Sequence, residues 1–260
     1  MHKQALLNLI QPACIMLTGV NDACLHGKRV ERIFSVIVFG LILWLYWSTW
    51  RLVLHPWLVE SYQGEGASQD GYVGSVIFLA IYHLTCLATI WSMIMVTNTS
   101  PGFVPENYQA NYSGIGGTDW CFKCERARPA RAHHCRYCRR CILRMDHHCP
   151  WIGSCVGYWN HGHFLRFLTY ASLSCLLALT ATSIRLFRGY FIYEDLSNYY
   201  RLEELNEIGL IVAIINAAFT LCILMMLLIL TGYQWSNSLW NMTTIEHLEW
   251  EAANDRAIRH

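Results

Sequence analysis

The sequence predicts an α-helical polytopic membrane protein with four transmembrane helices and a cysteine-rich domain between helices 2 and 3. Three observations lead to this fold class. Of the 260 residues, 54% are hydrophobic and only 14% are charged, whereas a soluble domain has about 25% charged residues. Four apolar stretches reach the roughly 20 residues that a helix needs to cross a bilayer. Seven of the twelve cysteines fall between residues 121 and 155.

The apolar stretches comprise residues 33–54, 73–96, 164–187 and 208–231. Backbone polar groups in lipid must be hydrogen-bonded within the chain, so all four stretches are predicted to be helices. The net charge is +1, which lacks the basic excess typical of nucleic-acid-binding proteins. We therefore expect the lipid bilayer, and no nucleic acid, as a partner.

The distribution of basic residues predicts how the helices are oriented. The loop after the first helix carries three acidic residues and no Lys or Arg, and the loop after the third is mostly acidic. Residues 98–163 carry eight Lys and Arg, and the N-terminal arm carries four. The positive-inside rule then places the N- and C-termini and residues 98–163 in the cytosol. A Golgi, endoplasmic reticulum or plasma membrane would suit this arrangement.

This orientation divides the chain into five parts. Residues 1–32 form a cytosolic arm, and residues 33–97 form transmembrane helices 1 and 2. Residues 98–163 form the cytosolic cysteine-rich domain, and residues 164–231 form transmembrane helices 3 and 4. Residues 232–260 form a cytosolic tail. No internal repeat is evident in the sequence.

A dense cysteine cluster in the reducing cytosol indicates metal rather than disulfides. Cys-x2-Cys turns allow two thiolates to reach one tetrahedral zinc ion. Two closed sites need eight ligands, which six cysteines and two histidines supply, although spacing alone leaves other partitions open. One cysteine is then left over. Cys149 fits that place because it follows a histidine and precedes a proline in an aromatic turn expected to be exposed.

The pattern of the cysteine-rich domain resembles the DHHC protein S-acyltransferases, or palmitoyltransferases. The matching residues run as Cys121-x2-Cys124-x9-His134-Cys135-x2-Cys138-x2-Cys141-x4-Asp146-His147-His148-Cys149-x5-Cys155-x4-Asn160-x3-Phe164. A further match, Thr243-Thr244-Ile245-Glu246, follows the fourth helix, as it does in the family. Ser100-Pro101-Gly102 departs from the Asp-Pro-Gly that is usual after the second helix.

The resemblance implies an enzyme with a two-step acyl transfer. A long-chain acyl-CoA would be the co-substrate, and Cys149 would become the acyl-enzyme before a cysteine of a cytosol-facing protein takes the acyl group. His147 would act as the base and Asp146 would orient it. Two structural Zn²⁺ ions would have interleaved ligand sets: Cys121, Cys124, His134 and Cys141 for one ion, and Cys135, Cys138, His148 and Cys155 for the other.

The acyl chain needs an apolar pocket near the cytosolic face. Trp151 is expected at that interface, and Phe167, Tyr170 and Ser174 lie on one face of the third helix. We expect these four residues to line the acyl-chain pocket. The alternative for the helical stripe is ordinary lipid-facing or helix-packing surface.

Three other functions compete with the enzyme. A membrane-anchored zinc module of the RING type would explain the zinc and the helices, but not the spare cysteine beside Asp146 and His147, and the closing Cys-x2-Cys pair of a RING is missing. A transporter or channel is disfavoured because no predicted helix carries a cluster of charges. A catalytically silent scaffold of the same family would keep the fold, and acyl-enzyme formation separates it from the enzyme.

Overall fold

The structure is a computed structural model, and it describes residues 25–63, 69–109, 118–191 and 207–259. Most of the predicted N-terminal arm and the acidic loop before the fourth helix lie outside these ranges. Contacts divide the chain into two compact units. Of the described residues, the cysteine-rich unit comprises 25–38, 93–109, 118–164 and 237–259, and the helical unit comprises 39–63, 69–92, 165–191 and 207–236.

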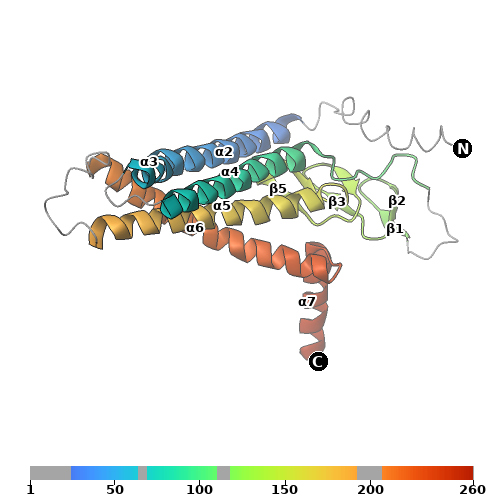
Figure 1. The fold of residues 1–260 in the computed structure, drawn as a ribbon. Coiled ribbons are helices and arrows are strands. Elements are labelled where there is room, and N and C mark those ends of the chain that lie inside the picture. Colours follow the sequence, from blue (N-terminus) through green and yellow to red (C-terminus); the bar gives the residue numbers. More distant parts are fainter. Residues whose placement is uncertain (1–24, 64–68, 110–117, 192–206, 260) are drawn as a thin grey trace, which may run out of the picture. The chain divides into compact units, whose positions relative to one another are not determined.

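Seven α- and π-helical segments lie within the described residues, and Figure 1 labels most of them along the chain. Four segments are long and apolar enough to cross a membrane, as predicted: Ile33–Val59, Gln69–Asn98, His161–Phe187 and Ile211–Leu239. The last of them has a mean hydropathy of 2.7, yet only 17% of its most apolar window is buried, as expected for a helix surrounded by lipid. The helical elements are α2 (Leu25–Thr49), η2 (Trp50–Leu54), α3 (His55–Gln63), α4 (Gln69–Asn98), α5 (His161–Phe191), α6 (Glu207–Leu239) and α7 (Thr244–Ile258).

The helices extend beyond the apolar stretches that predict them, and two of these extensions include residues of the cysteine-rich unit. Helix α5 begins at His161 rather than Phe164, and α6 continues to Leu239 rather than ending near residue 231. The polar residues at the end of α6 appeared to close an apolar span, but Gln234 and Asn237 are both 2% exposed. Helical hydrogen bonding therefore continues beyond the stretch that hydropathy can detect.

Proline changes the first membrane segment. Between α2 and α3 the chain forms the π-helical turn η2, which ends one residue before His55-Pro56. Proline has no backbone N–H to donate to the preceding turn. The wider π-helical turn accommodates this missing donor without ending the helix.

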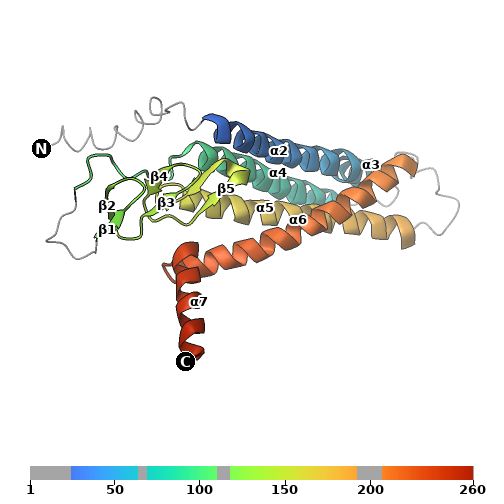
Figure 2. The ribbon, with the colours of Figure 1, turned by 180° about the vertical axis from the view of Figure 1, so that it is seen from behind.

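Small and aromatic side chains fill the interior of the helical unit. A buried cluster contains Leu54, Tyr82 and Ala178, which come from η2, α4 and α5. The side chain of His83 in α4 is hydrogen-bonded to the Tyr46 hydroxyl in α2 at 3.3 Å, and these two helices run side by side in Figures 1 and 2. An interhelical hydrogen bond is thus the role of this intramembrane histidine.

Three short antiparallel hairpins form the cysteine-rich unit, and Figure 2 labels five of their six strands. The 3-10 helix η3 (Pro150–Ile152) lies in the loop of the third hairpin. Each strand has only three or four residues, so side-chain interactions must hold the hairpins together. The pairs are β1 (Thr118–Cys121) with β2 (Arg126–Pro129), β3 (His133–Cys135) with β4 (Arg140–Ile142), and β5 (His147–Cys149) with β6 (Ser154–Val156).

Two residues fasten the third hairpin. The Asn160 side chain is fully buried, accepts a hydrogen bond from Gly157 N at 2.9 Å and donates one to the Cys155 carbonyl at 2.8 Å. A Cβ atom on Gly157 would lie 2.5 Å from the Pro101 carbonyl and 2.7 Å from Ile142 Cγ2. The backbone at Gly157 therefore approaches its neighbours more closely than any other residue type allows.

This close approach predicts that Gly157→Ala is destabilising. The added methyl group must displace backbone as well as a side chain, so the free energy of unfolding should fall by about 1–3 kcal/mol. Thermal unfolding of the detergent-purified protein measures the change. Gly74→Ala is the control, because no atom lies within 4 Å of the added Cβ there. Equal unfolding temperatures for the two variants would contradict this account.

Candidate functional site

The three hairpins repeat one pattern every 14 residues, which corrects the expectation that the chain has no internal repeat. Cys121, Cys135 and Cys149 each end the first strand of a hairpin, and each pairs with the residue five positions later. A residue with positive φ precedes every returning strand: Glu125 (51°), Arg139 (53°) and Gly153 (62°). The sequence signal was the equal spacing of these cysteines, which the irregular residues between them obscured.

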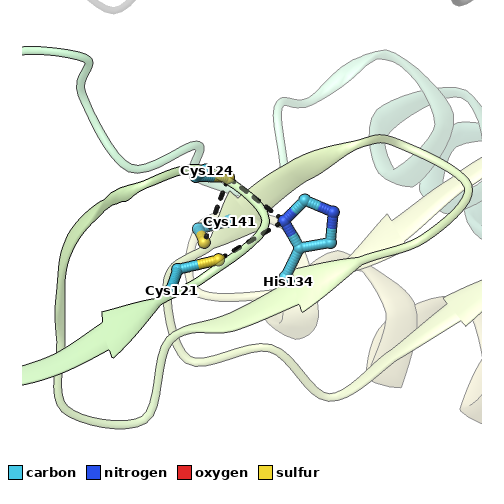
Figure 3. A group of neighbouring side chains, drawn as sticks. All are labelled: Cys121, Cys124, His134 and Cys141. Carbon is cyan, nitrogen blue, oxygen red and sulfur yellow. Dashed lines mark hydrogen bonds between the residues drawn. The ribbon is translucent and has the colours of Figure 1, made fainter.

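The first group of metal-binding side chains joins the first two hairpins. Figure 3 shows Cys121, Cys124, His134 and Cys141 directed at a common centre. His134 Nδ1 lies 3.6 Å from Cys121 Sγ and 3.1 Å from Cys124 Sγ, and the Cys124 and Cys141 sulfurs are 3.8 Å apart. Sulfur and nitrogen ligands around one tetrahedral zinc ion lie about 3.5–3.8 Å from one another. The donor set and its spacing therefore fit a closed tetrahedral metal site.

The second group joins the second and third hairpins in the same way. His148 Nδ1 lies 3.5 Å from Cys135 Sγ, 3.6 Å from Cys138 Sγ and 3.4 Å from Cys155 Sγ. In each group all four ligand atoms lie within 4.8 Å of one another. The structure thus brings together the two interleaved sets that the family resemblance implied, out of the partitions that spacing alone left open.

Each group takes two of its three cysteines from the turn of one hairpin. Its histidine and its third cysteine come from the next hairpin. The pairs His134–Cys141 and His148–Cys155 stand directly opposite each other in the strand register. A metal ion in either group would therefore join two hairpins that belong to separate two-stranded sheets. Tyr137 covers the second group, because its ring stacks on His148 with a centroid distance of 4.7 Å.

Strand geometry separates the adjacent histidines. Side chains alternate between the two faces of a strand, so His148 points to one face of β5 while His147 and Cys149 point to the other. Cys149 belongs to neither metal group. It is only 6% exposed, whereas the Pro150–Trp151 turn that follows it is exposed, as expected. Pairing with Ser154 across the hairpin places the cysteine inside the unit.

The Asp146 carboxylate is 1% exposed and accepts three hydrogen bonds. His147 Nδ1 donates at 2.7 Å, and the backbone N and side-chain Oγ1 of Thr244 donate at 2.7 and 2.9 Å. Burial opposes the charge on Asp146, but these hydrogen bonds outweigh it and lower the pKa of the carboxyl to about 2. Burial also disfavours charge on His147, yet hydrogen bonding to Asp146 and Cys149 raises the imidazole pKa to about 9. The pairing with Asp146 therefore stabilises the imidazolium that His147 becomes when it accepts a proton.

The start of α7 is anchored to the cysteine-rich unit. Thr243 caps the helix in a capping box with Glu246, and Arg131 donates hydrogen bonds to both Glu246 carboxylate oxygens. Arg131 Nη2, which donates to Glu246 Oε2, also donates to the Asn241 carbonyl at 2.7 Å. Burial works against the charge on Glu246, but the guanidinium of Arg131 lowers the pKa of this carboxyl below its usual range. Sequence reasoning missed Arg131, since nothing local marks a partner 115 residues away.

The four residues predicted to line an acyl-chain pocket lie in different units. Trp151 is in the cysteine-rich unit, 56% exposed, with its ring 5.6 Å from that of Phe34. Phe167, Tyr170 and Ser174 lie on α5 in the helical unit. The Ser174 hydroxyl is within 3.3 Å of Thr89 Oγ1 on α4, which shows a packing contact. The pocket itself stays a prediction.

Comparisons with known proteins point to one family. The family model described as DHHC palmitoyltransferase matches residues 115–251. The chain is 30% identical over 165 residues to probable protein S-acyltransferase 12 of Arabidopsis thaliana, with 58% of this chain and 55% of the relative covered. It is 30% identical over 198 residues to palmitoyltransferase ZDHHC15 of Xenopus laevis, covering 62% and 55% of the two chains. The chain thus spans about half the length of these curated relatives.

The contact between α7 and Asp146 predicts the effect of Thr244→Val. The buried carboxylate would lose its hydroxyl donor but keep the backbone donor, so stability should fall by about 1–2 kcal/mol. Unfolding in detergent measures this loss. Thr180→Val is the matched control, because the Thr180 hydroxyl is exposed and bonds only the Leu176 carbonyl of its own helix. A loss no larger than that of the control would contradict the proposed anchoring.

Proposed function

Because the chain belongs to the DHHC palmitoyltransferase family, we propose that it is a protein S-acyltransferase. It moves a long-chain acyl group, with palmitoyl as the type, from acyl-CoA to cysteine thiols of membrane-associated proteins. One observation carries the proposal. A thiol outside both metal groups lies on the same strand face as a histidine that a buried carboxylate holds.

The first step forms an acyl-enzyme on Cys149. A cysteine attacks as its thiolate, and His147 accepts the proton of the Cys149 thiol. The sulfur adds to the thioester carbonyl of acyl-CoA, and the bond from this carbonyl carbon to the CoA sulfur then breaks. CoA leaves as a thiol with the proton that His147 returns. The product is a new thioester between the acyl group and Cys149, and no redox change occurs.

The second step transfers the acyl group to the protein substrate. A cysteine of that substrate loses its proton to His147 and attacks the acyl-enzyme carbonyl. The carbonyl–sulfur bond to Cys149 breaks, and Cys149 regains a proton from His147. The same base thus serves both half-reactions, and the free enzyme is restored.

Asp146 acts through His147. Its oxygen accepts the Nδ1 proton of His147 at 2.7 Å, which leaves Nε2 as the nitrogen that exchanges protons with the thiol. The negative charge of Asp146 also stabilises the imidazolium that forms during each step. Thr244 holds this carboxylate with two hydrogen bonds, so α7 fixes the base indirectly.

The two Cys₃His groups hold two structural Zn²⁺ ions in this proposal. Three thiolates and one imidazole fill all four tetrahedral positions of each ion. When bound, the metal supplies cross-links that shape the loops. The chemistry of acyl transfer is left to Asp146, His147 and Cys149.

The membrane supplies the remaining partners. The four apolar helices support an integral, multi-pass protein. The distribution of basic residues supports cytosolic termini, and the membrane in this proposal is that of the Golgi, the endoplasmic reticulum or the cell surface. Acyl-CoA and cytosol-facing cysteine-containing proteins then meet Cys149 from the cytosolic side. The acyl chain needs an apolar pocket, because burial of each CH₂ group contributes roughly 0.8 kcal/mol. In this proposal the pocket is lined by Trp151, Phe167, Tyr170 and Ser174.

Intact mass spectrometry tests the first half-reaction. Detergent-purified protein incubated with palmitoyl-CoA should gain one palmitoyl mass, which hydroxylamine removes because it cleaves thioesters. Cys149→Ser should gain none. The matched control Cys222→Ser, which changes an exposed cysteine of α6, should gain the adduct as the unaltered protein does. A folded, metal-loaded sample without any adduct would exclude the enzyme and favour the scaffold or the zinc-dependent interaction module.

A further inference from the structure

The third hairpin has the architecture of a metal-binding knuckle without its metal. We propose that Ile152 is the residue that keeps metal away from Cys149, and so allows this cysteine to react. This inference rests on the proposed role of Cys149 as the nucleophile.

The 14-residue repeat assigns equivalent positions in the three turns. The first two turns contain Cys121-x2-Cys124 and Cys135-x2-Cys138, and both belong to metal groups. The third turn contains Cys149-x2-Ile152. All three turns connect their strands in the same register and close with a residue of positive φ. Cys149 therefore occupies the place of a first thiolate ligand, and Ile152 occupies the place of the second.

The side chain at this position decides whether the turn can hold an ion. Ile152 is 1% exposed, so an apolar group fills the space that a ligand sulfur fills in the other hairpins. Zinc needs ionised sulfur, imidazole nitrogen or oxygen donors, and an isoleucine supplies none. A single free thiolate without a second anchored donor is a weak metal site.

Among the residues that the structure describes, the repeat also supplies no second half of a third site. Each metal group takes a His–Cys pair from the following hairpin, and the second pair lies 14 residues after the first. The next step of 14 residues reaches Gly162 and Thr169, which lie in α5 rather than in a fourth hairpin. His147 is the remaining donor beside Cys149. A cysteine at position 152 would therefore create a three-donor site formed by Cys149, the new thiol and His147.

The test compares Ile152→Cys with Ile152→Ser. Serine is nearly the same size as cysteine, but its hydroxyl is a poor zinc ligand. Elemental analysis should find three zinc ions per chain in Ile152→Cys and two in both Ile152→Ser and the unaltered protein. Alkylation of Cys149 by iodoacetamide, followed by peptide mass spectrometry, should be slower by at least about tenfold in Ile152→Cys than in Ile152→Ser. A chelator should restore the rate, because an open three-donor site releases zinc before the closed sites do.

Two zinc ions and equal alkylation rates in the two variants would overturn the proposal. If neither variant folds under ordinary conditions, expression with added zinc decides. Zinc should rescue Ile152→Cys alone, and failure to rescue it, or rescue of both variants, would overturn the proposal. Neither readout needs acyl-CoA. Absence of an acyl-enzyme would therefore contradict the proposed function, whereas the zinc content and the alkylation rates would still test the role of Ile152.

Discussion

The convergence of side chains in the two Cys₃His groups is the constraint on which the cysteine-rich unit depends. Its strands have three or four residues, too few for backbone ladders to fix the fold. Its buried clusters contain Cys121, Cys141, Cys135 and Cys155, so ligands occupy the place that a hydrophobic core has in larger domains. Since each group takes donors from two successive hairpins, two ions would fasten all three hairpins, and metal binding would supply most of the folding free energy.

The same constraint organises the chemistry. Fixing His148 on a metal fixes strand β5, and the alternation of side chains then directs His147 and Cys149 to the opposite face. Asp146 accepts hydrogen bonds from His147 and from Thr244 at the start of α7, so segments 98 residues apart converge on one carboxylate. A side chain of the second metal-binding group and the proposed nucleophile thus share one three-residue strand, and Cys149 belongs to neither metal-binding group.

Much of this arrangement follows from local sequence patterns. Hydropathy identifies the four membrane helices, and cysteine spacing identifies the metal-binding residues, because both signals come from residues close together in the chain. The contact of Arg131 with Glu246 spans 115 residues and leaves no local signal. The extension of α6 past residue 231 uses polar side chains that hydropathy reads as an end. The 14-residue repeat gives only a partial signal in the sequence, because its third turn has Ile152 where the first two turns have Cys124 and Cys138.

X-ray absorption spectroscopy at the zinc edge, combined with the zinc content per chain, tests the central claim most directly. The account predicts two zinc ions per chain, each with three sulfur atoms at about 2.3 Å and one nitrogen at about 2.0–2.1 Å. The spectrum should not change in Cys149→Ser, because this thiol lies outside both groups. One zinc ion per chain, an average of two or four sulfur ligands, or a changed spectrum in Cys149→Ser would contradict the account.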